Sequence, residues 1–235
     1  FSEEWDVIVE VGPGPAVLTP HLAAHGKPLY VIEKDSRFEH RLTEHVEPSR
    51  VFIIDALKFD WDQFITDHKL ENKKIWLVSN LPYNVGTILY TGFLSISHIK
   101  YMTLMFQKEV GDKTFVRVIK NEMNGLLFLS QNYFDAKLLK NVSPGCFAPP
   151  PRVDSVVVSY IRKEEPVISC SDFVRLNKFC RALFQFKRKQ LGNVLKSTYP
   201  KELVTEALEK AEIESNLRTE TLDFEKIYNL YNALK

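Results

Sequence analysis

Short apolar runs alternate with segments of helical periodicity along the first part of the chain. Each run is brief, largely apolar and ends at glycine or a polar residue, which is typical of buried parallel strands. The predicted strands are 7–11, 29–32, 51–54, 75–79 and 101–106. Helical spacing separates them at 16–24, 37–45 and 85–97. Strands alternating with helices predict a parallel sheet with helices on both faces.

The pattern changes toward the C-terminal end. A helix is predicted at 126–134 and a long β-branched strand at 153–161, and the Glu- and Pro-containing segment 163–171 is typical of a linker. Beyond it the apolar spacing is helical throughout, at 173–186, 189–196, 201–211 and 224–234. We therefore predict a Rossmann-like α/β domain over 1–165 and a small α-helical domain over 166–235.

Composition narrows the class of protein. The chain has 235 residues, of which 45% are hydrophobic and 26% charged, as in ordinary soluble globular proteins. It contains no apolar run of about 18 residues, and because it opens with neither a basic n-region nor an apolar h-region we expect no signal peptide. Cys146, Cys170 and Cys180 form no CxxC pair, which argues against a disulfide framework or zinc site and favours the cytoplasm. Because the chain opens at Phe1, directly before a strand, we expect a native upstream segment.

The net charge of +1 hides a strong asymmetry. A stretch without any Asp or Glu carries eight cations, and a net acidic segment begins at Glu202. A charge run is usually a solvated helix face, but the complete lack of acids favours contact with an RNA backbone. The cations are Arg175, Lys178, Arg181, Lys187, Arg188, Lys189, Lys196 and Lys201.

A glycine-rich turn joins the first strand to the first helix, with the sequence Glu10-Val-Gly12-Pro-Gly14-Pro-Ala. Such a turn lets the backbone approach a ligand at the carboxyl ends of the strands. Prolines at 13 and 15 remove amide donors that a pyrophosphate would use, so the turn suits a ligand without phosphate. A tight strand–helix connection without ligand is the alternative reading of this turn.

Two further acids end the next strands. Glu33 lies about 20 residues after the turn, a spacing that suits hydrogen bonds to ribose hydroxyls. Asp55 ends the third strand, where it is placed to accept from an adenine amine. Acids at strand ends are often only helix caps, but with the glycine turn they indicate an adenosyl ligand.

The fourth strand ends in Asn80-Leu81-Pro82-Tyr83, a candidate reaction site. An adenine amine is a poor nucleophile because its lone pair is delocalised into the ring. Hydrogen-bond acceptors such as the Asn80 amide oxygen and the Leu81 carbonyl can direct this lone pair at a methyl group. Pro82 stiffens the turn, and Tyr83 offers a ring for stacking on an extruded base. Phe147, ahead of three prolines, is the candidate second ring, with core packing as the alternative. The chemistry is direct methyl transfer by positioning and charge stabilisation, without a metal.

The sequence resembles the ribosomal RNA adenine N6,N6-dimethyltransferase family through most of its length. The resemblance is carried by Glu10–Gly14, Leu18-Thr19, Glu33–Asp35, Asp55-Ala56, Asn80–Asn84, Gln107–Val110, Phe147–Ser155 and Lys187–Leu191. It implies a class I methyltransferase fold with S-adenosylmethionine as donor, and Gly12, Glu33, Asp55 and Asn80 at cofactor positions. We expect Glu10, Gly14 and Ala56 to complete the cofactor-binding set. It also implies a monomer that dimethylates two adjacent adenosines near the 3′ end of 16S RNA in the small ribosomal subunit and aids subunit assembly.

Three departures from the family pattern stand out. The family's basic arm and Gly-Gln segment are expected to lie in the upstream segment, Pro15-Ala16 replaces a further glycine, and the stretch 111–123 does not follow the usual pattern. A large-subunit RNA adenine methyltransferase of the antibiotic-resistance type shares the site chemistry and is one alternative. A non-catalytic RNA-binding or transcription factor on the same fold is the other, although such a chain should have lost part of its acids or its Asn80–Tyr83 turn.

Overall fold

The computed structural model describes residues 4–115, 123–186 and 189–235, and the chain forms two compact units. Unit 1 comprises Phe1–Asp112 and Phe134–Glu164, and unit 2 comprises Lys113–Tyr133 and Glu165–Lys235. The sequence boundary at 165/166 placed residues 113–133 in the first domain, whereas the structure groups them with the helical unit. None of the helices within the described ranges has the length and apolar character needed to span a bilayer.

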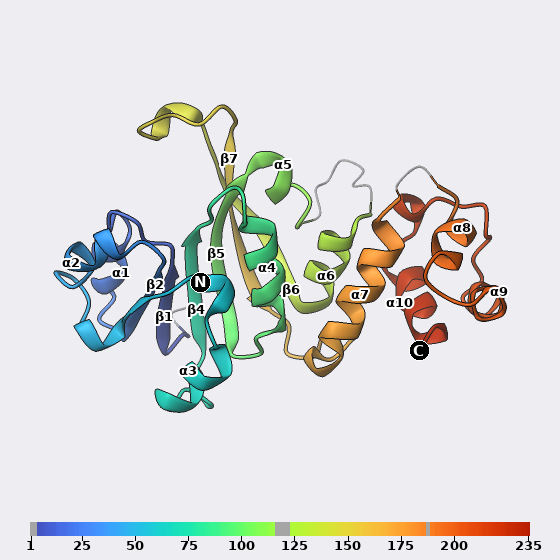
Figure 1. The fold of residues 1–235 in the computed structure, drawn as a ribbon, viewed down its shortest axis with the longest axis horizontal. Helices are drawn as coiled ribbons and strands as arrows, with labels where there is room; N and C mark the ends of the chain where they lie inside the picture. Colours follow the sequence, from blue (N-terminus) through green and yellow to red (C-terminus); the bar gives the residue numbers. More distant parts are fainter. Residues whose placement is uncertain (1–3, 116–122, 187–188) are drawn as a thin grey trace. The chain divides into compact units, whose positions relative to one another are not determined.

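Unit 1 is built on a seven-stranded sheet in the order β3-β2-β1-β4-β5-β7-β6 (Figure 1). The first five strands are parallel, and β7 runs antiparallel between β5 and β6. Their bounds are β1 Val7–Val11, β2 Leu29–Glu33, β3 Val51–Ile53, β4 Ile75–Asn80, β5 Ile99–Gln107, β6 Phe134–Val142 and β7 Ser155–Arg162. Because the parallel strands share one direction, their carboxyl ends lie along one edge of the sheet.

The helices of unit 1 connect these strands. The longest is α4 Gly86–Ser95, between β4 and β5. Shorter α-helices are α1 Thr19–Ala23, α2 Glu39–Leu42, α3 Trp61–Asp67 and α5 Lys108–Gly111. Single 3-10 turns are η1 Ser36–Phe38, η2 Pro48–Arg50, η3 Ala56–Lys58 and η4 Pro144–Cys146.

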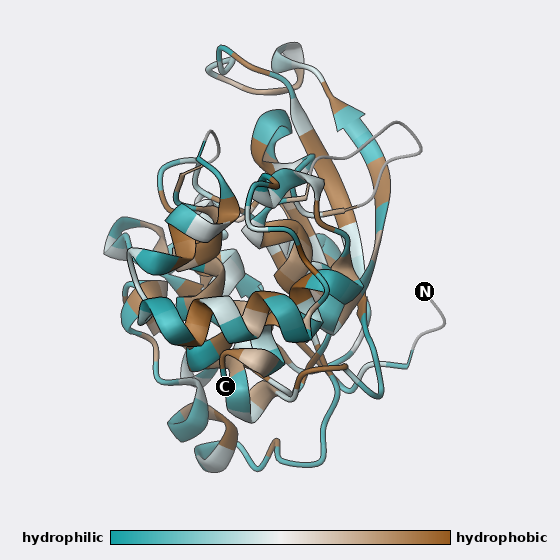
Figure 2. Ribbon diagram, turned by 90° about the vertical axis from the view of Figure 1, so that its right-hand side faces the viewer, coloured by the Kyte–Doolittle hydropathy of each residue, from teal (hydrophilic) through white to brown (hydrophobic). Residues whose placement is uncertain are grey.

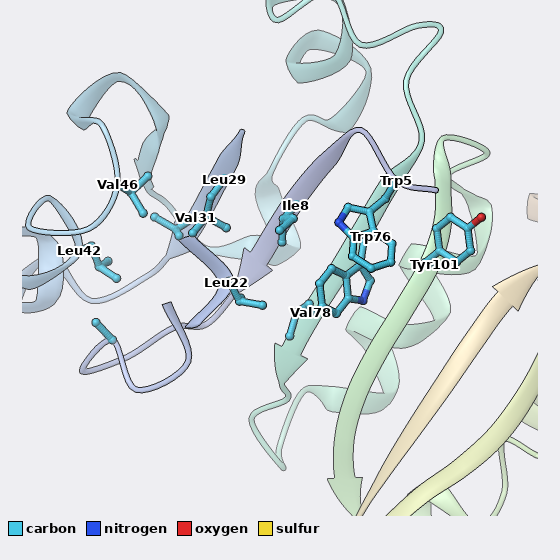
Figure 3. Packing of buried hydrophobic residues seen from close by; sticks show 11 residues of the cluster. Trp5, Ile8, Leu22, Leu29, Val31, Leu42, Val46, Trp76, Val78 and Tyr101 are labelled. Atoms are coloured by element: carbon cyan, nitrogen blue, oxygen red, sulfur yellow. The ribbon is translucent and has the colours of Figure 1, made fainter. Parts of the chain in front are cut away.

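An aromatic cluster lies at the amino ends of β1, β4 and β5 (Figure 3). The rings of Trp5 and Trp76 lie 4.6 Å apart, and Tyr101 meets Trp5 edge-on at 6.1 Å. Ile8 on β1 and Val31 on β2 are fully buried beside them. Burial of such rings and aliphatic side chains supplies the main favourable free energy of folding, and it holds β1, β2 and β4 together in the sheet whose carboxyl edge carries the candidate site.

Unit 2 is helical, with α6 Gly125–Tyr133, η5 Cys170–Asp172, α7 Phe173–Phe184, α8 Leu191–Lys196, α9 Lys201–Lys210, η6 Thr219–Thr221 and α10 Phe224–Ala233. These helices are striped in brown and teal in Figure 2, as expected of amphipathic helices. The buried side of α7 carries Leu176, Phe179 and Leu183, and Phe179 meets Tyr231 of α10 at 5.3 Å. The helices predicted for this part of the chain are confirmed.

The sequence analysis missed several elements, among them β6, α3 and the four-residue α5. Strand β6 was not predicted, because it is the sheet edge and buries only Phe134 fully, so it lacks an apolar run. Helix α3 was not predicted either; it has seven residues and begins at a cap in which Asp60 accepts from the Gln63 amide at 3.0 Å. The last predicted strand begins at Ser155 rather than at 153.

Candidate active site

The turn after β1 depends on left-handed backbone conformations. Gly12 and Gly14 have φ of 68° and 55°, a region that favours glycine, and Ala16 has φ of 63°. A Cβ added at either glycine would meet no atom within 4 Å. Open space beside both glycines is what a ligand needs for a close approach to the backbone.

Two acids lie under this turn. Glu10, 2% exposed, accepts a hydrogen bond from the Thr19 hydroxyl at 2.7 Å. Burial raises the pKa of Glu10 to about 7; the Thr19 bond opposes the rise, and the charge of Glu33 adds to it. The Glu33 carboxylate accepts from the amides of Gly14 at 2.9 Å and Asp35 at 2.8 Å, so it fastens the turn to the end of β2.

Asp55 follows β3 at the same edge of the sheet. Pairing of β3 with β2 places it near Glu33, since the Ile54 amide donates to the Glu33 carbonyl at 2.8 Å. One Asp55 oxygen caps η3 by accepting from the Leu57 amide at 3.1 Å, and the other accepts from Lys34 at 2.8 Å. The Lys34 hydrogen bond is the main cause that lowers the pKa of Asp55. Asp55 therefore does cap a helical turn, as the alternative interpretation had it. Its predicted hydrogen bond with an adenine amine stays a prediction.

Asn80 is the last residue of β4 and is exposed at the carboxyl edge. The next residue, Leu81, is 1% exposed, and its amide donates to the Met105 carbonyl at 3.2 Å. The buried Leu81 side chain anchors the turn in the core, where it packs within 3.3 Å of the position a Gly86 Cβ would take. This anchoring holds the exposed Asn80 and Pro82 at fixed positions on the edge.

Tyr83 is half-buried and tied to the start of β7. Its hydroxyl lies 2.8 Å from the hydroxyl of Ser155, which is fully buried. Phe147, also half-buried, follows η4 in the loop that leads to Ser155, ahead of a cis Ala148–Pro149 bond. Within the described residues no ring contact joins Phe147 to Tyr83, so a two-ring sandwich around a base stays a prediction.

Several polar residues that hold the site were not singled out from the sequence. Thr19 supports Glu10, and Ser79, 2% exposed, donates to the Val11 carbonyl at 2.6 Å, which joins the ends of β4 and β1. Ser155 holds Tyr83. Thr19 stands in a segment that carried the family resemblance, and Ser79 directly precedes Asn80, but neither position alone indicated its partner.

The predicted RNA-binding cations lie in unit 2. Arg175, Lys178 and Arg181 recur every third residue on α7 and are exposed, so they share one helix face. The Arg175 guanidinium also donates to the carbonyls of Leu234 and Lys235, which ties α7 to the end of α10. Exposed Lys189 holds its ammonium 4.1 Å above the Phe186 ring. Lys187 and Arg188 lie outside the described residues.

Comparison with solved structures identifies the fold. A dimethyladenosine transferase from Plasmodium falciparum superposes with a TM-score of 0.74 at 23% identity, covering 97% of this chain and 89% of that one. The 23S rRNA methyltransferase ErmE gives a TM-score of 0.66 at 20% identity, with 98% and 91% covered. The fold is therefore that of the class I methyltransferases, as the sequence predicted.

Sequence comparison places the chain within that class. The model of the family described as ribosomal RNA adenine dimethylase matches residues 2–235. A Clostridium perfringens protein named ribosomal RNA small subunit methyltransferase A is 34% identical over 236 residues, covering 98% of this chain and 81% of that protein. The chain belongs to the ribosomal RNA adenine dimethylase family. Membership confirms the predicted class of enzyme, an S-adenosylmethionine-dependent methyltransferase that acts on ribosomal RNA.

Proposed function

We propose that this protein transfers methyl groups from S-adenosylmethionine to the exocyclic amines of two adjacent adenosines near the 3′ end of small-subunit ribosomal RNA, acting as a monomer and aiding subunit assembly. The observation that carries the proposal is the exposed Asn80 on a turn fixed by buried Leu81 and by the Tyr83–Ser155 hydrogen bond. The name of the Clostridium perfringens relative supports the small subunit as the source of the RNA.

The residues present fit an adenosyl donor. The acids Glu10, Glu33 and Asp55 at one sheet edge disfavour a pyrophosphate and suit a ligand that offers hydroxyl and amine donors and a positive charge. Glu33 already accepts two amides, and a carboxylate has about four lone-pair sites, so it can still accept from ribose hydroxyls. We assign Gly12, Gly14 and Ala56 to backbone contacts with the ligand. The donor, when bound, supplies an activated methyl group on a sulfonium.

The protein's own contribution is positioning. The Asn80 amide oxygen and the Leu81 carbonyl accept from the adenine amine, which directs its lone pair at the methyl group and stabilises the developing positive charge. Tyr83 and Phe147 offer rings that hold the extruded base by stacking. Fixing two reactants in line is worth several orders of magnitude in rate, so small shifts of this turn are costly.

The test follows methylation by mass spectrometry of digested RNA. The full-length protein is given S-adenosylmethionine with small-subunit particles that lack the modification, and separately with naked large-subunit RNA. Dimethyladenosine in the small-subunit sample alone is the expected result. Signal in the large-subunit RNA alone would overturn the proposed substrate, and signal in neither, despite cofactor and RNA binding, would overturn the proposed activity.

Asn80→Ala should lower the methylation rate on the order of 10²-fold or more, the usual loss when one positioned polar group is removed from a reaction site. Binding of S-adenosylmethionine, measured by calorimetry, should remain detectable. The matched control is Asn72→Ala, at an exposed residue that precedes β4 and so lies away from the carboxyl edge. Full turnover by Asn80→Ala would remove Asn80 from the mechanism.

A further inference from the structure

A groove in unit 1 lies outside the proposed reaction site. Segment 56–62 and helix α4 with the residues that follow it line a hollow of about 490 Å³. Ala56 is its one residue from the candidate site; Asn80, Tyr83 and Phe147 do not line it. The ring of Trp61 on α3 meets the ring of Phe93 on α4 edge-on at 6.1 Å, so the two helices meet at this hollow.

The groove is lined by apolar side chains that stay accessible. Leu57 is 47% exposed and Ile88 is 56% exposed, and both line the same hollow as the half-buried Trp61. Single exposed apolar residues are ordinary on protein surfaces. Here three accessible apolar side chains, those of Leu57, Trp61 and Ile88, line one hollow. Gly92 deepens the hollow, because it is exposed on α4 and a Cβ there would meet nothing within 4 Å.

The acidic rim decides what kind of partner fits. Asp60 and Asp62 line the groove, and segment 54–71 holds five Asp or Glu residues against two Lys. His98 lines the groove as well. This charge repels an RNA backbone and attracts Lys or Arg. Sites for small molecules enclose most of the ligand, whereas exposed Leu57 and Ile88 suit an extended or helical peptide.

We propose that this groove binds a segment of a partner protein in which an apolar anchor is flanked by Lys or Arg. The anchor packs on Trp61 and Ile88 beside Gly92, and the flanking cations meet Asp60 and Asp62. A tryptophan in an apolar pocket is the residue type that most often dominates a protein interface, and its ring also attracts cations. The groove shares only Ala56 with the candidate active site and adds a protein partner to the RNA substrate.

The experiment selects from a displayed library of random twelve-residue peptides against the wild-type full-length protein, with no selection against any variant. The best peptide is then titrated by calorimetry and by the fluorescence of Trp61, with Trp61→Phe to separate its signal from those of Trp5 and Trp76. We expect enriched peptides that carry Lys or Arg beside an apolar residue. Gly92→Gln fills the groove and Asp62→Lys reverses its charge, and each should weaken binding at least tenfold.

The matched control is Asp67→Lys, which makes the same charge change on α3 at a residue that does not line the groove, and it should alter affinity less than twofold. Thermal melts show that each variant is folded. The proposal is overturned if no peptide is enriched, if enriched peptides lack cations, or if they bind Gly92→Gln as well as wild type. An RNA oligonucleotide that binds the wild type and is lost with Gly92→Gln would also overturn it.

Discussion

Carboxylates near the carboxyl ends of β1, β2 and β3 sit in different protonation environments because their partners differ. Glu10 is buried with one hydroxyl donor, and its pKa rises to about 7. Asp55 meets the Lys34 ammonium, which lowers its pKa. Asp35, just beyond β2, is bonded by Arg37, which brings its pKa to about 2. One edge thus carries acids that stay ionised and one that titrates near neutrality.

The raised pKa of Glu10 predicts a pH-dependent stability. In the folded protein Glu10 holds its proton up to about pH 7, whereas in the unfolded chain its pKa is the ordinary 4.5. The contribution of this proton to the free energy of unfolding is therefore complete below pH 4.5 and is lost as the pH rises through about 7. At roughly 1.4 kcal/mol per pKa unit, the loss between pH 5 and pH 8 is on the order of 2 kcal/mol.

Glu10→Gln keeps an acceptor for Thr19 and removes this titration. Urea unfolding without cofactor, compared at pH 5 and pH 8, should show the variant gaining on the wild type at pH 8. An equal difference between the two proteins at both pH values would contradict the assigned protonation. The sequence singled out Glu10 as a candidate cofactor-binding residue beside the glycine turn, but it could not predict its protonation, because its burial and its bond to the Thr19 hydroxyl arise only when the chain is folded.

At the scale of elements, contacts between segments far apart in sequence determine the positions of β5, β7 and β6 in the sheet. Arg162, the last residue of β7, is buried and donates to the carbonyls of Leu94 at 3.1 Å and Ile96 at 2.8 Å. These bonds give hydrogen-bond partners to carbonyl groups at the C-terminal end of α4, which have none within the helix. Arg162 also donates to Ile99 at 2.7 Å. Strand β6 completes the edge, although its residues are mostly exposed. No local pattern around residue 162 or in β6 predicts these contacts, since both depend on the assembled sheet.

Helix α5 packs closely on β7, and this predicts an intolerance of any side chain at Gly111. An added Cβ would overlap Cγ2 of Val156, which is fully buried and, being β-branched, is stiff. Gly111→Ala should therefore lower the free energy of unfolding by about 1–3 kcal/mol through overpacking. Gly92→Ala is the control: it is also helical but has open space, so it should stabilise by about 0.5–1 kcal/mol. Denaturant melts of the two variants measure both effects, and equal effects would contradict this account of the packing.

At the scale of the whole chain, the sequence predicted the order of strands and helices well because buried parallel strands and amphipathic helices have distinct apolar periods. It did not predict that residues 113–133 belong with the helical unit. That grouping rests on long-range contacts such as the paired hydrogen bonds between Asn132 and the backbone of Ile168, at 2.8 and 2.9 Å. The charged residues are distributed unevenly between the two units. Segment 54–71 of unit 1 is acidic, and segment 173–201 of unit 2 contains no Asp or Glu.

This separation predicts that affinity for RNA depends on the cations of unit 2 rather than on net charge. Replacing Arg188 and Lys189 by Ala should weaken RNA binding and reduce the slope of log affinity against log salt by roughly 1 to 1.5, because each phosphate contact contributes about 0.7 on single-stranded nucleic acid. Fluorescence anisotropy with a small-subunit RNA fragment at several salt concentrations measures the slope. The control pair Lys210→Ala and Lys226→Ala removes the same charge from exposed positions of α9 and α10 outside the acid-free stretch. If the control pair lowers the slope equally, net charge and not the basic stretch governs binding; if neither pair changes it, the stretch is only a solvated face.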